Sequence, residues 1–407
     1  MEIKKYGFVL ATTLIMMVSP AMAEEKDYQN TTLSGNWGGV RDSLAQKGIN
    51  TDITYKLDGV SNIAGGAKEG ARILDNLDIV FSMDGEKLVG SSGTSALLYL
   101  LNNNGGRPDG DLVKSGQGID NIEVPRATAK LYQAWIQQEL WDKKLSLLAG
   151  LYDLNSEFYV TPASGMFIHP TYGIGTDMSQ SGTNGPSIFP FSALAARVKI
   201  QPLDNMYVQA AVIDGVAGDP SNPTGTQIEW HKKDTTLLVG EAGYNADNHL
   251  LAVGGWRYSK RFADYVAVDS NGNALNTSSS GLYLLGETPV NDNITAFARL
   301  GFADGDVNQF NYAWSTGIVY KQIFPSREQG QLGVAIHGAH NSSPYKKSQL
   351  AAATPVDNSE HGIEVTYSDQ LTPWLKIQPD VQYIINPGTT PNVDDALIIG
   401  TRLTINF

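Results

Sequence analysis

The chain has 407 residues, a formal net charge of −13 and no cysteine. This acidic balance argues against binding to nucleic acid, because each phosphate contact needs a cation. The missing cysteines exclude disulfides. The 42 glycines and 18 tyrosines, together with only 17% charged residues, favour a β-rich chain.

The first residues predict export from the cytoplasm. Two lysines precede an apolar run over residues 7–18, and the small-residue site Ala21-Met22-Ala23 follows it. This pattern is typical of a secretory signal peptide and is too short to span a bilayer as a mature helix. We therefore expect residues 1–23 to be cleaved off. No later stretch of about 18 apolar residues predicts a membrane helix.

Strict alternation of apolar and polar residues predicts long strands. In the last segment Leu403, Ile405 and Phe407 share one face, while Arg402 and Thr404 share the other. The segments approach the nine to eleven residues with which a tilted strand crosses a bilayer. About sixteen strands are predicted: 50–58, 75–83, 94–102, 130–140, 144–153, 191–201, 206–214, 235–243, 249–258, 280–288, 293–302, 310–320, 330–338, 361–368, 373–385 and 395–407.

The connections between these strands alternate between short and long almost throughout. The segment 141–144 is a short turn, whereas 154–190 and 259–279 are long loops. Short periplasmic turns and long extracellular loops are typical of outer-membrane barrels. The sequence therefore predicts an all-β protein, a transmembrane antiparallel β-barrel of about 16 strands over residues 49–407. An even number of strands would place both termini on the side of the short turns.

The chain ends inside a predicted strand, on Phe407. A closed barrel needs such a strand, because an unpaired edge would leave main-chain groups unsatisfied in lipid. The terminal ring would lie at the periplasmic membrane interface, in an aromatic girdle. By the same alternation we expect Tyr320, Tyr367 and Trp256 to face lipid near strand ends.

A short helix is predicted before the first strand. Val40 and Leu44 have helical spacing, and Gly48 can end the helix. We expect residues 24–48 to form an N-terminal periplasmic segment, and a linker role is favoured over a plug for the pore.

Four stretches carry a resemblance to a known family. They are "SGNWGGVRDSLAQKGI" at 34–49, "AGLYDLNSEF" at 149–158, "GPSIFPFSALAARVKIQP" at 185–202 and "WLKIQPDVQYIINPG" at 374–388. Their ordered combination resembles the carbohydrate-selective porin (OprB) family. The resemblance implies a sixteen-stranded outer-membrane channel that passes monosaccharides such as glucose, with the loops around "GPSIFPFSA" narrowing its mouth. It also implies that the assembly machinery of the outer membrane reads the terminal strand. No motif that defines one sugar can be matched, so the preferred sugar stays open.

Inward-facing polar residues near the middle of strands are candidates for lining the pore. Guanidinium donors and carboxylate acceptors suit sugar hydroxyls, and an aromatic ring offers a flat apolar face. The alternative is that these charges only pair across the wall and keep the lumen wet. We expect Arg402→Ala to leave folding almost intact, because water in the lumen can solvate the gap, and to alter conductance, ion preference or glucose block instead. The strand candidates are Asp78, Trp135, Arg197, Arg299, Glu364, Asp380 and Arg402.

Further candidates lie at the ends of strands. Asp153, Asn155 and Glu157 begin the long loop over 154–190, where such residues either form turns or contact a sugar. Arg72 precedes the second predicted strand and would lie near the outer mouth.

The sequence offers little support for an enzyme. His337 and His340 lie on a strand that runs into a loop, so their spacing does not indicate a metal site. Neither a G-x-S-x-G motif nor a phosphate-binding loop occurs. No cofactor is expected, and the expected partners are small sugars and outer-membrane lipids. A porin for small non-sugar solutes such as aromatic acids, a barrel enzyme with a non-local triad, and a structural surface protein remain alternatives.

Overall fold

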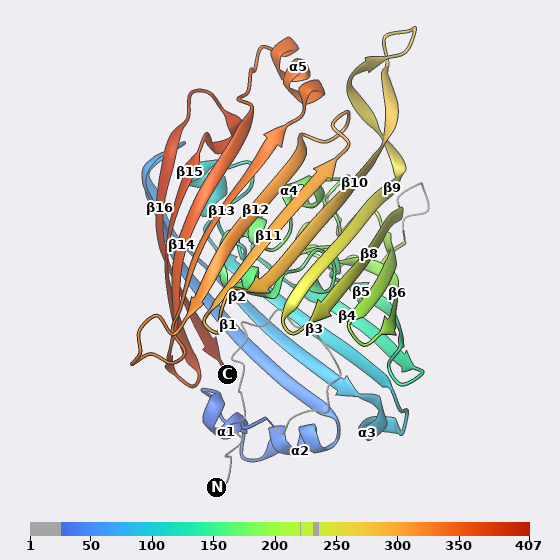
Figure 1. The fold of residues 1–407 in the computed structure, drawn as a ribbon, viewed down its shortest axis with the longest axis vertical. Coiled ribbons are helices and arrows are strands. Elements are labelled where there is room, and N and C mark those ends of the chain that lie inside the picture. The colour runs from blue at the N-terminus through green and yellow to red at the C-terminus, as the bar shows by residue number, and fades with distance from the viewer. Residues whose placement is uncertain (1–25, 220, 231–235) are drawn as a thin grey trace.

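The computed structural model describes residues 26–219, 221–230 and 236–407. Within them, sixteen strands form a closed barrel in which all neighbouring strands are antiparallel and β16 pairs with β1 (Figure 1). The predicted fold class is confirmed. The expected signal peptide at 1–23 lies outside the described residues. The strands are β1 (Ile49–Gly66), β2 (Gly70–Asp84), β3 (Thr94–Gly105), β4 (Thr128–Leu140), β5 (Leu145–Tyr152), β6 (Ala193–Leu203), β7 (Met206–Asp214), β8 (Thr236–Ala246), β9 (His249–Val268), β10 (Ala274–Pro289), β11 (Ile294–Ala303), β12 (Phe310–Lys321), β13 (Gln331–Asn341), β14 (Ser359–Thr372), β15 (Leu375–Ile385) and β16 (Asp394–Asn406).

Short helices occur before the barrel and in its connections. Two of them precede β1, and Figure 1 shows them beside the C-terminus at one end of the barrel. No helix in the described part of the chain is long and apolar enough to cross a membrane. The helices are α1 (Tyr28–Thr31), α2 (Val40–Gln46), α3 (Gly85–Val89), η1 (Asp109–Val113), η2 (Leu154–Ser156), η3 (Pro162–Met166), η4 (Pro170–Tyr172), α4 (Thr176–Ser179), α5 (Ser343–Ala351) and η5 (Pro387–Thr389).

The first and last strands close the barrel along a long seam. Asp58 lies opposite Arg402 and Leu57 opposite Leu403 in the register. The main-chain N–H of Phe407 donates to the carbonyl of Ile53 at 2.8 Å. The pairing therefore reaches the last residue of the sequence, as the alternation over 395–407 predicts.

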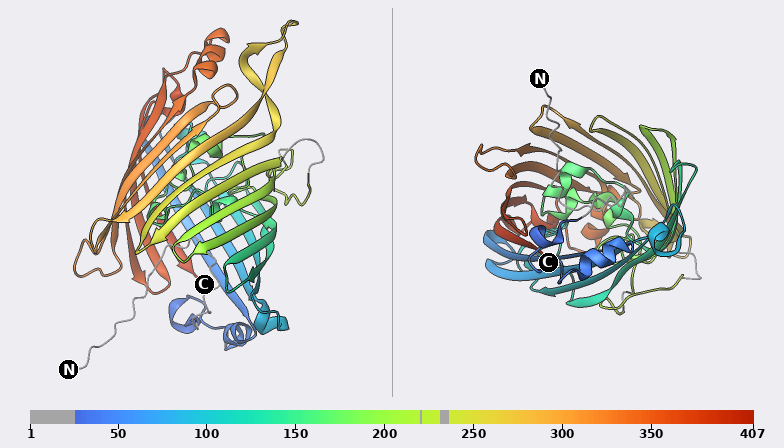
Figure 2. Two further views of the ribbon diagram at one scale, coloured as in Figure 1. Left: turned by 45° about the vertical axis from the view of Figure 1, so that its right-hand side comes forward. Right: turned by 90° about the horizontal axis from the view of Figure 1, so that it is seen from below.

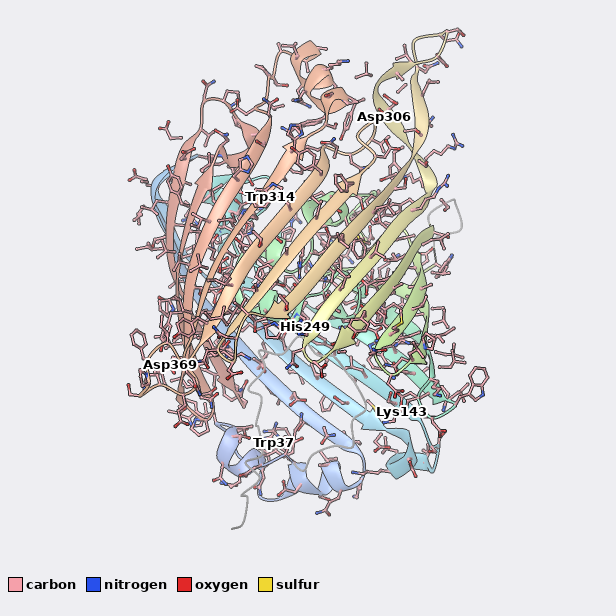
Figure 3. All side chains as sticks on the ribbon, viewed as in Figure 1. Trp37, Lys143, His249, Asp306, Trp314 and Asp369 are labelled. Atoms are coloured by element: carbon pink, nitrogen blue, oxygen red, sulfur yellow. The ribbon has the colours of Figure 1, made fainter. Side chains whose placement is uncertain are left out.

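Aromatic residues face outward near both ends of the barrel. On β12, Tyr312 and Trp314 lie toward the end opposite the termini, and Figure 3 places Trp314 there. Tyr320 lies at the other end of the same strand. Leu332 on β13 is opposite both Tyr320 and Tyr367 of β14, so the two tyrosines lie at the same level of the wall. Apolar strand faces between two aromatic belts are the outer surface of a membrane barrel.

Trp256 does not face lipid, so its predicted orientation is wrong. Its side chain is 3% exposed and packs edge-on against Tyr258, with the ring centroids 5.9 Å apart. Gly281 lies opposite Trp256 and leaves room for the indole. Both faces of β9 are apolar here, because its inner face packs against a loop inside the barrel. Hydrophobicity alone could not separate the two faces.

One predicted loop is largely a hairpin. Residues 259–279, expected as a long loop, continue β9 and β10 beyond the rest of the barrel wall, as Figure 1 shows. The connection left between the two strands covers only residues 269–273. Strand pairing continues here without alternation of apolar and polar residues, because antiparallel hydrogen bonds satisfy the main chain outside lipid as well.

The loop between β5 and β6, residues 153–192, folds into the barrel. Seen from the end, it lies within the ring of strands (Figure 2). Its side chains Phe158, Tyr159 and Met178 are almost fully buried against inward residues of the wall such as Trp256. The largest apolar core therefore lies between this loop and the wall.

Candidate translocation site

The β5–β6 loop follows the inner wall of the barrel. At its start, Arg197 on β6 donates two hydrogen bonds to Glu157, at 2.9 and 3.1 Å. Next along the loop, the main-chain N–H of Tyr159 donates to Glu241 on β8 at 2.9 Å. The loop thus contacts first β6 and then β8.

Two further wall glutamates hold the rest of this loop. Glu287 on β10 accepts from the N–H of Ala163 at 2.7 Å. Glu364 on β14 accepts from the N–H groups of Ile168 and His169 at 2.7 and 2.9 Å. Three glutamates therefore fix the main chain of the loop along the wall from β8 to β14.

Arg299 supports the same loop from β11. Its guanidinium donates to the hydroxyl of Thr161 at 3.0 Å and to that of Ser164 at 2.6 Å. The guanidinium also lies 5.9 Å from the ring centre of Tyr159, which stacks on Tyr283 of β10 at 4.0 Å. Arg299 is 4% exposed, so it braces the loop and is not an open pore wall.

Two buried histidines join the loop to β13. The rings of His169 and His337 lie 3.9 Å apart, and Nδ1 of His337 is 3.0 Å from the hydroxyl of Tyr172. Within the described ranges, no group of three or more His, Asp or Glu side chains has the spacing to hold a metal ion. His340 lies on the opposite face of β13, consistent with the interpretation that this sequence pair is not a metal site.

A second loop, residues 106–127 between β3 and β4, also enters the barrel. Glu360 on β14 accepts from the hydroxyl of Ser115 and the N–H of Gly116, both at 2.7 Å. It accepts a third bond from the N–H of Gln117 at 3.1 Å. The β3–β4 loop is therefore held as the β5–β6 loop is, by a buried wall glutamate.

Arg402 ties the β3–β4 loop to the seam. Its Nη2 donates to Asp58 at 2.6 Å, to Asn121 at 2.8 Å and to Asp120 at 3.4 Å. Arg402 is 7% exposed, which argues against the expectation that lumen water would fill its place without a loss of stability. Removing it would leave the carboxylates of Asp58 and Asp120 buried without a cation, which destabilises a fold strongly.

Among the described residues, the β5–β6 loop makes no polar contact with one arc of the inner wall, the free arc, although Val80 and Leu97 of this arc belong to the same apolar cluster as Phe158 of the loop. Among residues that the structure describes, no hydrogen bond or ion pair joins this loop to β1, β2 or β3. Asp78 on that arc accepts from Lys56 at 3.0 Å and from the hydroxyl of Tyr99 at 2.6 Å. The side chains of Lys56 and Asp78 are 30% and 12% exposed, so Lys56 is the more accessible of the two. The arc therefore presents a cation, a carboxylate and a phenol together.

The indole of Trp135 lies on β4, next to this arc. Its Nε1 donates to the amide oxygen of Gln133 at 3.2 Å. Tyr99 packs edge-on against Tyr132, with the ring centroids 5.1 Å apart. Aromatic faces beside amide and carboxylate groups form a surface that can hydrogen-bond a polyol and also contact its apolar face.

Two loop carboxyl groups have altered acidity. Burial raises the pKa of Asp153 to about 6, against hydrogen bonds from the hydroxyl of Tyr132 and the N–H of Asn155. Burial also raises the pKa of Asp177 to about 7, and one oxygen of Asp177 has no hydrogen-bond partner. Near neutral pH, Asp177 is therefore partly protonated.

The eleven candidates from the sequence divide into three groups. Asp78 and Trp135 belong to or border the free arc. Asp153, Asn155 and Glu157 act within the β5–β6 loop, where Asn155 donates to the carbonyls of Phe158 and Gly173 at 3.1 and 3.2 Å. The remaining residues face inward and fasten loops or neighbours: Arg72 to Asp111, Arg197 to Glu157, Arg299 to Thr161 and Ser164, Glu364 to Ile168 and His169, Asp380 to Gln382, and Arg402 to Asp58.

Several residues of the site were not singled out from the sequence. They are Lys56 and Tyr99 on the free arc, and the loop-binding Glu241, Glu287 and Glu360. Alternation along β8 places Glu241 on the inner face, between Val239 and Gly243. It gives no sign that the partner of Glu241 is a main-chain group of a distant loop.

Comparison with known proteins agrees with this geometry. The family model for "Carbohydrate-selective porin, OprB family" matches residues 68–407. The chain belongs to this family. Porin B of Pseudomonas aeruginosa is 24% identical over 98% of this chain and 97% of its own length. Putative porin QuiX of Acinetobacter baylyi is 21% identical over 92% of this chain and 93% of its own length.

Solved structures show the same fold. The high-pH structure of Pseudomonas putida OprB superposes with a TM-score of 0.85 at 21% identity, over 93% of this chain and 99% of that one. Its low-pH structure gives 0.60 at 17% identity, over 94% and 100%. This OprB-family chain is a porin of the outer membrane, a channel and not an enzyme.

Proposed function

We propose that this porin lets glucose and other small sugars diffuse passively into the periplasm. The observation that carries the proposal is the free arc of the inner wall. Lys56 offers donors there, Asp78 offers acceptors, and the rings of Tyr99 and Trp135 border them. Such a surface can exchange hydrogen bonds with successive hydroxyls without holding any of them tightly, as transport requires.

The fixed loops support the same proposal. A channel selects by size only if its narrow part keeps its shape, and Glu241, Glu287 and Glu364 hold the β5–β6 loop by its main chain. A solute would then pass between this loop and the free arc of β1 to β3.

A liposome-swelling assay tests the proposed substrate. Proteoliposomes should swell rapidly in isotonic glucose and more slowly in a large oligosaccharide. Empty liposomes, and liposomes with heat-denatured protein, are the controls. Exclusion of glucose by folded protein would refute the proposal.

A channel for small organic acids is the second candidate. Inward lysines favour it: Lys130 lies 4.5 Å from the ring centre of Phe191, and Lys199 lies 5.0 Å from that of Tyr207. An aromatic acid that permeates faster than glucose at equal concentration gradients would favour this candidate.

We also propose the targeting steps predicted from the sequence. Residues 1–23 would be cleaved as a signal peptide, and residues 24–48 would lie in the periplasm. The outer-membrane assembly machinery would read the terminal strand ending in Phe407, and lipid would surround the outward strand faces. N-terminal sequencing of the mature protein tests the cleavage, and a start other than near Glu24 would contradict it.

A further inference from the structure

A shallow groove lies on the outer, lipid-facing side of the barrel over β7 to β9. In the strand register Ala210 lies opposite Gly240, and Gly240 lies opposite Gly255. The residues before and after each of the three are buried and face inward, so Ala210, Gly240 and Gly255 face outward. They form the floor of the groove, which presents one methyl group and two hydrogens to the lipid. The floor is part of a broader concavity of about 1570 Å³ that reaches from Ile136 on β4 to Phe302 on β11.

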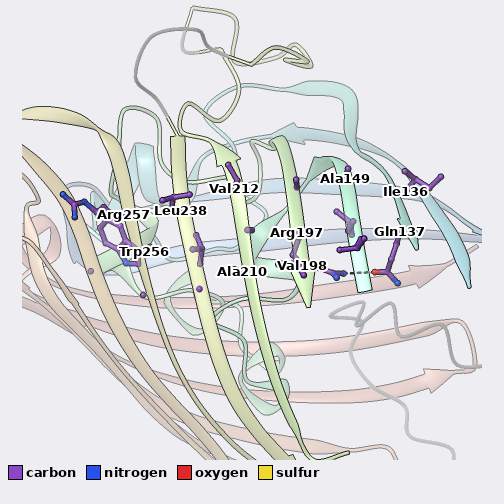
Figure 4. Close-up of a pocket in the computed structure, with 18 of the residues that line it drawn as sticks. Ile136, Gln137, Ala149, Arg197, Val198, Ala210, Val212, Leu238, Trp256 and Arg257 are labelled. Atoms are coloured by element: carbon purple, nitrogen blue, oxygen red, sulfur yellow. Dashed lines mark hydrogen bonds between the residues drawn. The ribbon is translucent and has the colours of Figure 1, made fainter. Parts of the chain in front are cut away.

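Larger apolar side chains surround the floor. Val212, Leu238 and Leu282 are 41%, 49% and 65% exposed and project outward around it. Figure 4 shows Val212 and Leu238 on the outer side of the wall, whereas Arg197 reaches the inner side and bonds Gln137. The groove is therefore shaped and lined for a hydrocarbon chain.

A cationic side chain, that of Arg257, lies at one end of the groove. Arg257 lies two residues beyond Gly255 on the same face of β9, opposite Leu238 and Ser280 in the register. Within the described part of the chain it has no hydrogen bond or ion pair. It lies beyond the floor on the side away from His249, toward the hairpin that joins β9 to β10. Guanidinium groups bind phosphate in a bidentate manner.

We propose that the groove binds an outer-leaflet lipid with a phosphorylated headgroup. The phosphate would pair with Arg257, and an acyl chain would lie over Ala210, Gly240 and Gly255. A second copy of the barrel fits this face less well. A two-fold contact would bring the two Arg257 side chains together and remove them from water without an anion.

Native mass spectrometry of the detergent-purified porin tests this site. The probe is lipid A with its phosphate groups, compared with lipid A from which they have been removed. We expect the wild type to retain the phosphorylated form at least tenfold more tightly. Arg257→Gln should remove this preference.

Gly240→Leu tests the acyl part of the groove. A Cβ at Gly240 would meet no atom closer than the carbonyl of Gln209 at 3.9 Å, so the barrel can accept the side chain while the groove is filled. We expect this variant to bind the phosphorylated lipid at least tenfold more weakly. Heat-modified gel mobility checks that each barrel is folded.

Arg261→Gln is the matched control. Arg261 is exposed on the same face of β9, four residues further from the floor, and donates to the carbonyl of Asn276 at 3.3 Å. This variant should bind like the wild type. Equal binding by wild type, Arg257→Gln and Gly240→Leu would overturn the proposal, and so would equal binding of the two lipid forms. Dimers that Arg257→Gln strengthens would assign the face to a second copy instead.

Discussion

Nη1 of Arg41 donates a hydrogen bond to the main-chain oxygen of Phe407 at 2.8 Å, joining the N-terminal helix α2 to the last residue of the barrel. The same guanidinium donates to the carbonyl of Thr51 at 2.7 Å and lies 4.0 Å from the ring centre of Tyr28. Arg41 is 1% exposed. The N-terminal segment is therefore fastened to both strands of the closing seam.

Arg41→Ala should weaken the closure of the barrel. The change removes hydrogen bonds from a charged donor and a cation–π contact, which together are worth on the order of 3 kcal/mol. Urea unfolding in detergent measures the loss. Lys47→Ala at the end of the same helix is the control and should change stability by less than about 0.5 kcal/mol. Equal midpoints for the two variants would show that Arg41 does not support the seam.

Phe407 can be tested by deletion, which also removes the acceptor for Nη1 of Arg41. Deleting Phe407 removes the bond from its N–H to Ile53 and the interfacial ring. We expect less assembled barrel and more protein in the periplasm, measured by fractionation and gel mobility. Assembly at the wild-type level would make the aromatic end incidental.

Leu403 and Arg402 are neighbours on β16 with opposite environments. Leu403→Arg should destabilise the barrel by about 2–4 kcal/mol, because lipid offers the charge no partner. Arg402→Ala should also be costly, about 3–5 kcal/mol, because it leaves buried carboxylates without their cation. Both values can be read from urea unfolding.

A second change separates the two causes. Adding Asp58→Asn to Arg402→Ala should restore part of the lost unfolding free energy, because one uncompensated charge disappears. The same addition should not stabilise Leu403→Arg. Full stability of Arg402→Ala alone would mean that water solvates the site after all.

Glu364 should control how steadily the β5–β6 loop is held. Glu364→Ala removes the acceptor for the N–H groups of Ile168 and His169. We expect noisier single-channel currents, because the loop loses one of its three glutamate anchors. Val365→Ala, at the adjacent lipid-facing position, is the control and should leave the current noise unchanged. Quiet channels in Glu364→Ala would show that the other contacts suffice.

The raised pKa of Asp177, about 7 against an ordinary value of 3.8, predicts a dependence of stability on pH. Between these values the native state keeps a proton that the unfolded chain releases, so stability falls as pH rises from about 4 to 7. The effect of this group is at most about 4 kcal/mol, at about 1.4 kcal/mol per pKa unit.

Asp177→Asn should remove this contribution. Unfolding midpoints at about pH 5 and pH 8 should differ less in the variant than in the wild type. An unchanged pH dependence would show that Asp177 remains ionised, or that other groups dominate.

Strand number and most strand faces could be predicted because alternation has a direct physical cause. Leu403 and Arg402 differ in whether lipid or protein lies beside them, and the sequence records that difference. The predicted direction of the Trp256 side chain was wrong, because a loop inside the barrel packs against β9 and makes its inner face as apolar as its outer one.

The partners of the inward charges could not be predicted. Parity places Arg299 and Glu364 inside, but their partners are hydroxyl and main-chain groups of a loop more than 100 residues away in the chain. Lumen water and a folded loop are equally compatible with a polar strand face, so only the three-dimensional path of the loop decides whether a charge lines the pore or fastens a wall.

The free arc of β1 to β3 is tested most directly by planar-bilayer recording with glucose titrated in. The account predicts that glucose reduces the wild-type single-channel current in a concentration-dependent and saturable manner. Asp78→Asn should weaken this block, whereas Val365→Ala, on the lipid-facing side of β14, should retain it. Open channels that glucose does not affect, or the same block in Asp78→Asn as in the wild type, would contradict a sugar path along this arc.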